Sequence, residues 1–222
     1  MSDYSVTRDR VEDYFDRSAT KVWERLTSDA PVSRIRQTVR EGRDRMRAIM
    51  LDRLPTDLRG ARVLDAGCGT GLMTAELAAR GADVVAVDIS PQLIGIAEQR
   101  LSDDLKPRVS FHAGDMTCPS HGRFDYVMAM DSLIYYRAPD IAEALAKVGS
   151  RTARAVVFTV APRTPFLMTF FTVGKLFPRS DRSPVMIPQD WRKLAAHTGG
   201  TLDRIERVTR GFYISECLEY RP

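Results

Sequence analysis

A glycine-rich turn that follows a short apolar run is the part of the sequence whose residue types and spacing indicate chemistry most directly. The run 62–66 leads into an Asp-x-Gly-x-Gly-x-Gly pattern, whose defined positions are Asp65, Gly67, Gly69 and Gly71. Glycines at the carboxyl end of a strand let a ligand approach the backbone closely, because no Cβ stands in the way. The preceding carboxylate would repel a dinucleotide pyrophosphate and attract a cationic amino group. The pattern therefore predicts a site for a cationic amino-acid ligand.

Carboxylates also follow the next two apolar runs. Asp88 ends the run 84–87, where a carboxylate can accept hydrogen bonds from two ribose hydroxyls. Gly114, Asp115 and Met116 follow the third run, where an aspartate can receive an adenine amino group. In an open α/β sheet, ligands bind outside the carboxyl ends of the strands. The three positions together predict a nucleoside ligand that carries an amino-acid part.

Short apolar runs alternate with helical patterns from Arg62 onward, which is typical of βαβ units and a mostly parallel sheet. Strands are predicted at 62–66, 83–87, 108–112, 124–130 and 154–160, with helices near 71–80, 91–101 and 139–149. Two helices within 4–54 precede them, and a helix near 188–198 and strands at 202–209 and 211–219 follow. A chain of 222 residues is long enough for one such α/β domain.

The composition excludes several other classes of protein. Hydrophobic residues make up 44% and charged residues 28%, which is near the globular average. The three cysteines form no C-x-x-C pair and the three histidines have no partner at metal-ligand spacing, so neither a disulfide framework nor a protein-bound metal is expected. The net charge of +4 accompanies no nucleic-acid-binding signature, so no nucleic-acid partner is expected. No signal peptide or apolar span is recognised, so the expected localisation is cytoplasmic.

Over about residues 60–160 the sequence resembles the class I S-adenosylmethionine-dependent methyltransferases. The Asp65 glycine turn, Asp88 and Gly114–Asp115 match the first three motifs of that family in order and spacing. The resemblance implies a Rossmann-like, seven-stranded, mostly parallel sheet that ends in an antiparallel hairpin. It implies S-adenosylmethionine as the methyl donor and S-adenosylhomocysteine as a product. The cofactor-binding residues it implies are Asp65, Gly67, Cys68, Gly69, Gly71, Asp88, Ile89, Gly114, Asp115, Met116 and Asp131.

A second resemblance covers most of the chain. The stretches 13–16, 32–33, 39–42 and 131–136, together with Trp23, are similar to the magnesium-protoporphyrin IX O-methyltransferases of (bacterio)chlorophyll biosynthesis. This resemblance implies methylation of the 13-propionate of magnesium protoporphyrin IX to the monomethyl ester. Contact with a magnesium chelatase subunit and peripheral association with the photosynthetic membrane are further expectations. The sequence departs from the family pattern at Thr27, where Tyr is frequent, and at Tyr135, where His is frequent, so a catalytic role for that histidine is not carried over.

Methylation of a carboxylate requires particular features of the site, and the sequence offers candidate residues for them. A propionate is already ionised at neutral pH, so no strong base is required. Alignment, partial desolvation and a cation for the second propionate remain. Arginines recur at helical spacing at positions 36, 40, 43 and 47, and they form either a carboxylate-binding wall or a solvated face paired with Glu41 and Asp44. The predicted substrate-binding residues are Tyr14, Trp23, Arg36, Arg40 and Arg43.

Aromatic residues leave further alternatives open. Tyr14, Phe15 and Trp23 either line a slot for the substrate or pack the N-terminal helix. Tyr135 and Tyr136 either orient the substrate carboxylate, as the predicted catalytic positions, or fill core space.

The predicted organisation is an N-terminal helical arm or cap over 1–58 and a methyltransferase domain over 59–222, with a lid-like insertion at 163–187. The apolar stretch 166–177 inside that insertion is a lid, a membrane contact or an amphipathic helix on the sheet.

Two other functions stay in consideration. One is a methyltransferase that acts on a quinone ring or another small carboxylate. The other is a porphyrin-binding escort protein, against which the complete cofactor motif argues.

Overall fold

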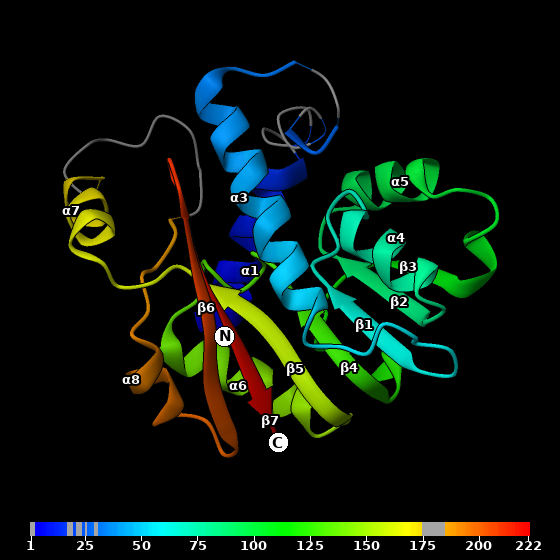
Figure 1. Ribbon diagram of the computed structural model, residues 1–222. Coiled ribbons are helices and arrows are strands. Elements are labelled where there is room, and N and C mark those ends of the chain that lie inside the picture. Colours follow the sequence, from blue (N-terminus) through cyan, green and yellow to red (C-terminus); the bar gives the residue numbers. More distant parts are fainter. Residues whose placement is uncertain (1–2, 17–19, 21–23, 25, 29–30, 175–184) are drawn as a thin grey trace.

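A computed structural model of the protein describes residues 3–16, 20, 24, 26–28, 31–174 and 185–222. These residues contain a seven-stranded sheet with the order β3-β2-β1-β4-β5-β7-β6 (Figure 1). The strands are β1 (Arg62–Ala66), β2 (Asp83–Asp88), β3 (Val109–Ala113), β4 (Phe124–Ala129), β5 (Thr152–Val160), β6 (Thr201–Arg210) and β7 (Tyr213–Arg221). β1 to β5 are parallel, whereas β7 runs antiparallel to both β5 and β6. The predicted fold class is therefore confirmed, including the C-terminal hairpin.

Helices connect and cover the strands (Figure 1). They are α1 (Asp3–Tyr14), α3 (Arg34–Leu51), α4 (Leu72–Ala79), α5 (Pro91–Arg100), α6 (Ala138–Gly149), α7 (Pro165–Gly174) and α8 (Trp191–Ala195). Single 3-10 turns, η2 (Lys106–Arg108) and η3 (Pro119–His121), precede β3 and β4. Ser33 and Ser90 cap α3 and α5, since each side chain accepts a backbone N–H of the first turn. Among the described residues, no helix is both long enough and apolar enough to cross a membrane.

The helix predicted near 188–198 is much shorter in the structure. Gln189 lies in an extended bridge with Pro162, and its N–H donates to the Ala161 carbonyl at 2.7 Å. Asp190 then caps the helix by accepting the Arg192 N–H. The helix cannot begin earlier, because the backbone before Asp190 is already paired with the segment after β5.

The central strands are buried on both faces, which explains why their sequences are almost continuously apolar. Val63 and Val84 pack with α3 and α4 on one face, whereas Leu64 and Val85 pack with α6 on the other. The two faces hold separate apolar cores, so the sheet is the middle of three layers.

Helix α3 packs against β6 and β7 and so joins the N-terminal part of the chain to the hairpin. Gly42 allows this approach, because a Cβ there would lie 2.6 Å from Cδ1 of Tyr213. At the hairpin turn, Gly211 has φ of +57° and a Cβ there would overlap Thr38. These two glycines place the middle of α3 directly beside the start of β7.

Candidate cofactor and substrate site

One cavity opens at the carboxyl ends of β1, β2 and β4, where α1 and α3 also meet the sheet. It encloses about 1050 Å³ that atoms do not fill, part of it open to solvent. Most of the residues predicted to bind the cofactor line it. These residues are Asp65, Gly67, Cys68, Gly69, Asp88, Ile89, Gly114, Asp115, Met116 and Asp131. Arg43, Tyr135 and Tyr136 are also in the wall, so the structure brings the predicted cofactor and acceptor sides together.

The three glycines of the turn serve different steric purposes. All have positive φ, a conformation that L side chains rarely adopt. Gly67 packs against Ser132, and a Cβ there would overlap the Ser132 Cβ. Gly69 faces the cavity, since a Cβ there would meet nothing within 4 Å. Gly71 caps α4 and packs against Ala97, so it stands outside the described cavity wall.

Two buried carboxylates, those of Asp65 and Asp88, lie beside the glycine turn. Asp65 accepts a hydrogen bond from Thr74 Oγ1 at 2.6 Å. Asp88 accepts the N–H groups of Gly69 at 2.8 Å and Ser90 at 2.9 Å. Burial raises the pKa of Asp65 to about 7, with the charge of Asp88 adding to the rise, and burial raises the pKa of Asp88 to about 6. Among the described residues, no Arg, Lys or His side chain acts on the pKa of either carboxylate, so this end of the cavity suits a cationic ligand.

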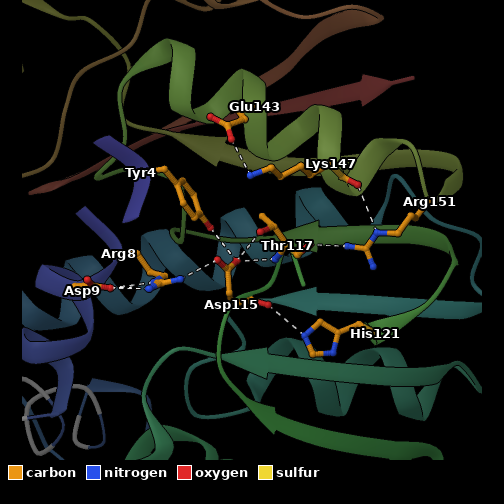
Figure 2. A network of polar contacts seen from close by, with 9 residues as sticks. All are labelled: Tyr4, Arg8, Asp9, Asp115, Thr117, His121, Glu143, Lys147 and Arg151. Atoms are coloured by element: carbon orange, nitrogen blue, oxygen red, sulfur yellow. Dashed lines mark hydrogen bonds and ion pairs between the residues drawn. The ribbon is translucent and has the colours of Figure 1, made fainter. Parts of the chain in front are cut away.

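The third carboxylate, Asp115, is held by residues of α1 (Figure 2). Tyr4 Oη donates to its Oδ1 at 3.0 Å and Arg8 Nη1 to its Oδ2 at 3.4 Å, while the Thr117 N–H donates at 2.7 Å. Partial burial raises the pKa of Asp115, but these hydrogen bonds outweigh burial and leave the pKa below its ordinary value. The Tyr4 ring stacks on Tyr136 with centroids 4.9 Å apart.

Tyr4 and Arg8 also line the cavity, although no sequence motif points to either residue. The one available signal was their spacing of four residues, which places both on the same face of a helix. Nothing local indicates which part of the protein that face meets.

Asp131, which follows β4 and lines the cavity, is the centre of a second polar cluster. It has φ of +55°, and it is the one non-glycine residue with positive φ among those described. Arg43 Nη1 donates to its Oδ2 at 2.5 Å, and Thr159 Oγ1 donates to its Oδ1 at 3.1 Å. Tyr213 Oη donates to Oδ1 at 3.1 Å. Burial and the charge of Asp131 raise the pKa of Tyr213, so its phenol stays protonated and donates.

The arginine row divides along α3. Arg43 and Arg47 reach the cavity wall, and Arg47 pairs with Asp44 at 2.7 Å. Arg36 is exposed, and Arg40 Nε donates to the Leu26 carbonyl at 3.0 Å. Only the C-terminal part of the arginine row, Arg43 and Arg47, therefore lies where it could bind a carboxylate in the cavity.

The predicted aromatic residues also divide. Phe15 lines the cavity and meets Tyr135 edge-on, with centroids 6.4 Å apart. Tyr14 packs on Phe15 with centroids 5.3 Å apart and is outside the described wall. Trp23 lies outside the described residues. Thr27, a departure from the family pattern, lines the cavity and accepts a hydrogen bond from Thr70 of the glycine turn at 2.8 Å.

In the part of the chain that the structure describes, no group of three or more His, Cys, Asp or Glu side chains is placed to hold a metal ion.

The sheet order, the glycine turn and the carboxylates at the ends of successive strands define a class I methyltransferase. Residues 63–154 match a family model described as a methyltransferase domain, and residues 129–222 match the model for the C-terminus of magnesium-protoporphyrin IX methyltransferase.

Comparison with individual proteins identifies the family within this class. The chain is 68% identical over 222 residues to a magnesium-protoporphyrin O-methyltransferase of Rhodobacter capsulatus, covering 100% of this chain and 99% of that protein. It is 29% identical to the enzyme of that name from Synechocystis, covering 94% of each. The crystal structure of magnesium protoporphyrin IX methyltransferase from Synechocystis with bound S-adenosylhomocysteine superposes with a TM-score of 0.80 and 27% identity, covering 97% of this chain and 100% of the other. The chain belongs to the magnesium-protoporphyrin O-methyltransferase family.

Proposed function

We propose that the protein transfers the methyl group of S-adenosylmethionine to the 13-propionate of magnesium protoporphyrin IX, giving the monomethyl ester and S-adenosylhomocysteine. This is a step of (bacterio)chlorophyll biosynthesis. The observation that carries the proposal is that the likeness to the Rhodobacter capsulatus enzyme extends over the whole chain, so it includes the segments on the acceptor side of the cavity. A likeness confined to the cofactor side would not distinguish this acceptor from a quinone or another carboxylate.

The cofactor side of the cavity fits the proposed donor. When bound, S-adenosylmethionine supplies an electrophilic methyl group on a sulfonium. In our proposal Asp65 holds the cationic amino group of the methionine part, because it is a buried carboxylate without a cationic partner among the described residues. Asp88 accepts the ribose hydroxyls, and Asp115 with Met116 contacts the adenine. Gly69 leaves its face of the turn open to the ligand.

The remaining residues of the turn complete the proposed cofactor site. Gly67 and Gly71 fix its backbone by packing on Ser132 and Ala97, and Cys68, Ile89, Gly114 and Asp131 border the ligand.

On the acceptor side, the residues need to bind and align a carboxylate rather than remove a proton. An ionised propionate is the nucleophile, so proximity and exclusion of water supply most of the acceleration. We assign a propionate to Arg43, whose guanidinium lies in the cavity wall. Burial raises the pKa of Tyr135, so its neutral phenol suits hydrogen-bond donation to that carboxylate. Tyr136, stacked on Tyr4, closes the same wall.

We further propose that 1–58 acts as an arm over the methyltransferase domain and that 163–187 is a lid-like insertion. The described ends of the insertion support this, because backbone hydrogen bonds attach both ends to the rest of the domain. The Arg163 N–H donates to the Gln189 carbonyl at 2.7 Å, and the Ile187 N–H donates to the Ile134 carbonyl at 2.8 Å. Ile134 immediately precedes Tyr135, so the insertion ends beside the proposed acceptor site, and its start is joined to Gln189, two residues beyond that end.

Contact with a magnesium chelatase subunit and peripheral association with the photosynthetic membrane belong to the same proposal. The apolar sequence of α7 and the 52% exposure of Phe166 support an apolar contact surface. Cosedimentation with liposomes tests the membrane part, and Phe166→Ser should lower the bound fraction. Equal binding by both proteins would contradict it.

Two titrations and a product analysis test the main proposal. Calorimetry measures binding of S-adenosylmethionine, and the Soret band measures binding of magnesium protoporphyrin IX. Both should bind, and mass spectrometry of the reaction product should show a porphyrin with one added methyl group. Donor binding without porphyrin binding would reject the substrate. Porphyrin binding without methyl transfer would favour the escort protein.

A matched pair of variants separates the enzyme from the escort protein. Asp88→Ala should lose donor binding and activity together, whereas Asp104→Ala, which removes an exposed aspartate, should keep both. An Asp88→Ala protein that no longer binds the donor but still supports pigment synthesis would overturn the enzyme assignment.

A further inference from the structure

Tyr213, the first residue of β7, touches two parts of the acceptor side at once. Its side chain is buried, with an exposed fraction of 8%. Its Oη lies 3.1 Å from Oδ1 and 3.3 Å from Oδ2 of Asp131. Its ring also fills the space beside Gly42, the residue directly before Arg43. A single side chain therefore contacts both the carboxylate that pairs with Arg43 and the helix that carries Arg43.

The hydroxyl of Tyr213 contacts both oxygens of Asp131, and each oxygen has one further side-chain donor. Thr159 Oγ1 donates to Oδ1 at 3.1 Å, and Arg43 Nη1 donates to Oδ2 at 2.5 Å. A guanidinium carries five N–H groups in a fixed plane, so the position of Nη1 constrains the direction of the whole group. A fixed Asp131 therefore determines which way the Arg43 guanidinium faces.

The backbone at Asp131 shows that this arrangement is strongly constrained. A non-glycine residue with φ of +55° is in an unfavourable conformation, which persists only when the surroundings stabilise it. The Asp131 N–H donates to Thr159 Oγ1 at 2.8 Å, and the side chain accepts from three residues. Such conformations concentrate at functional sites.

We propose that Tyr213 is a positioning residue for the acceptor: through Asp131 it orients the Arg43 guanidinium toward a propionate of the substrate. The inference rests on the proposed function, in which Arg43 binds that propionate. It adds that the C-terminal hairpin, which contributes no residue to the described cavity wall, controls acceptor binding. The competing explanation is that the Tyr213 hydroxyl only attaches the hairpin to α3.

A double-mutant cycle distinguishes the two explanations, because coupling through Arg43 is non-additive. Tyr213→Phe removes Oη and keeps the ring that packs on Gly42. The expected result is a rise of about tenfold in KM for magnesium protoporphyrin IX, the size typical of one hydrogen bond to a charged group. The change in kcat should be smaller, and the Kd for S-adenosylmethionine should not change. In an Arg43→Met background, Tyr213→Phe should raise KM no further.

Tyr220→Phe is the matched control, because Tyr220 is a buried tyrosine on the same strand and is not among the cavity-lining residues. Its KM should equal that of the unaltered protein. If Arg43→Met raises KM but Tyr213→Phe does not, or if the two effects simply multiply, Tyr213 does not act through Arg43 and the inference is wrong.

The failure of the proposed function would look different. If Arg43→Met leaves KM unchanged in an active enzyme, the assignment of the propionate to Arg43 fails and the inference fails with it. If the unaltered protein does not methylate the porphyrin, the substrate itself is wrong.

Discussion

At and above neutral pH, Asp65→Asn should stabilise the cofactor-free protein, and at every pH it should weaken binding of the donor. The Asp65 carboxylate is fully buried, and among the described residues its one side-chain hydrogen-bond donor is Thr74. Burial and the nearby charge of Asp88 raise its pKa from the ordinary 3.8 to about 7. Folding therefore disfavours the ionised form of this residue. Asparagine has nearly the same shape and carries no charge, so the substitution removes that penalty.

The size of the effect follows from the pKa and depends on pH. Because the pKa of Asp65 is higher in the folded protein than in the unfolded chain, the folded protein binds more protons between pH 3.8 and about pH 7. The stability of the original protein should therefore fall as pH rises through this window, by at most about 1.4 kcal/mol per pH unit. The destabilisation caused by Asp65 should grow by roughly 2 to 3 kcal/mol between about pH 5 and about pH 8, where it reaches about 4 kcal/mol. An unpaired amide N–H in the variant costs about 1 to 3 kcal/mol, but this cost does not vary with pH.

Urea unfolding of the cofactor-free proteins at several pH values measures the effect. The difference in the free energy of unfolding between Asp65→Asn and the original protein should grow in favour of the variant as pH rises. Asp104→Asn is the control, since the same substitution at an exposed position should show no such trend. Calorimetry should show that Asp65→Asn binds S-adenosylmethionine much more weakly. A difference that stays constant between about pH 5 and about pH 8 would refute the reasoning.

Three other predictions concern the turn, the arm and the core. Gly67→Ala should destabilise the protein by about 2 to 4 kcal/mol and abolish donor binding in calorimetry, because it combines positive φ with overlap on Ser132; unchanged donor affinity would contradict this. Tyr4→Phe should raise the Kd for the donor about threefold to tenfold, because Asp115 loses a hydrogen-bond donor, and an unchanged Kd would mean that α1 does not tune the site. Phe158→Ala should lower the free energy of unfolding by about 3 to 5 kcal/mol, because the ring is fully buried in β5; a loss below about 1 kcal/mol in urea unfolding would show that the core relaxes around it.

The alternation of strands and helices was predictable, because buried positions are occupied by apolar residues and their spacing differs between strands and helices. The inner parallel strands β1, β2, β4 and β5 are covered on both faces, so each appears as an apolar run, whereas the edge strand β3 is partly exposed. The helices between the strands carry their own start signals, such as Ser90 followed by Pro91. The prediction failed over 188–198, where helical pattern extends across residues whose backbone pairs with Ala161 and Pro162. A tertiary hydrogen bond decided that boundary, and no local pattern indicates it.

The sequence by itself predicted which carboxylates lie together on the proposed cofactor side of the cavity. Asp65 lies near the end of β1, Asp88 ends β2 and Asp115 follows β3. A parallel sheet brings the carboxyl ends of its strands to one edge, so local patterns suffice to assemble these carboxylates. Only the tertiary structure decided the acceptor side. Helical spacing places arginines on one face of α3, but it does not say that Arg43 meets a carboxylate while Arg36 meets solvent.

The hydrogen bonds that complete the site explain this difference. Tyr4 reaches Asp115 across 111 positions of the chain, and Tyr213 reaches Asp131 across 82. Such pairings depend on how α1 and the hairpin pack against the sheet, because the partner of a side chain is set by distance in space. A single sequence shows which polar side chains require hydrogen-bond partners. The packing of elements far apart in the chain determines which residues become those partners.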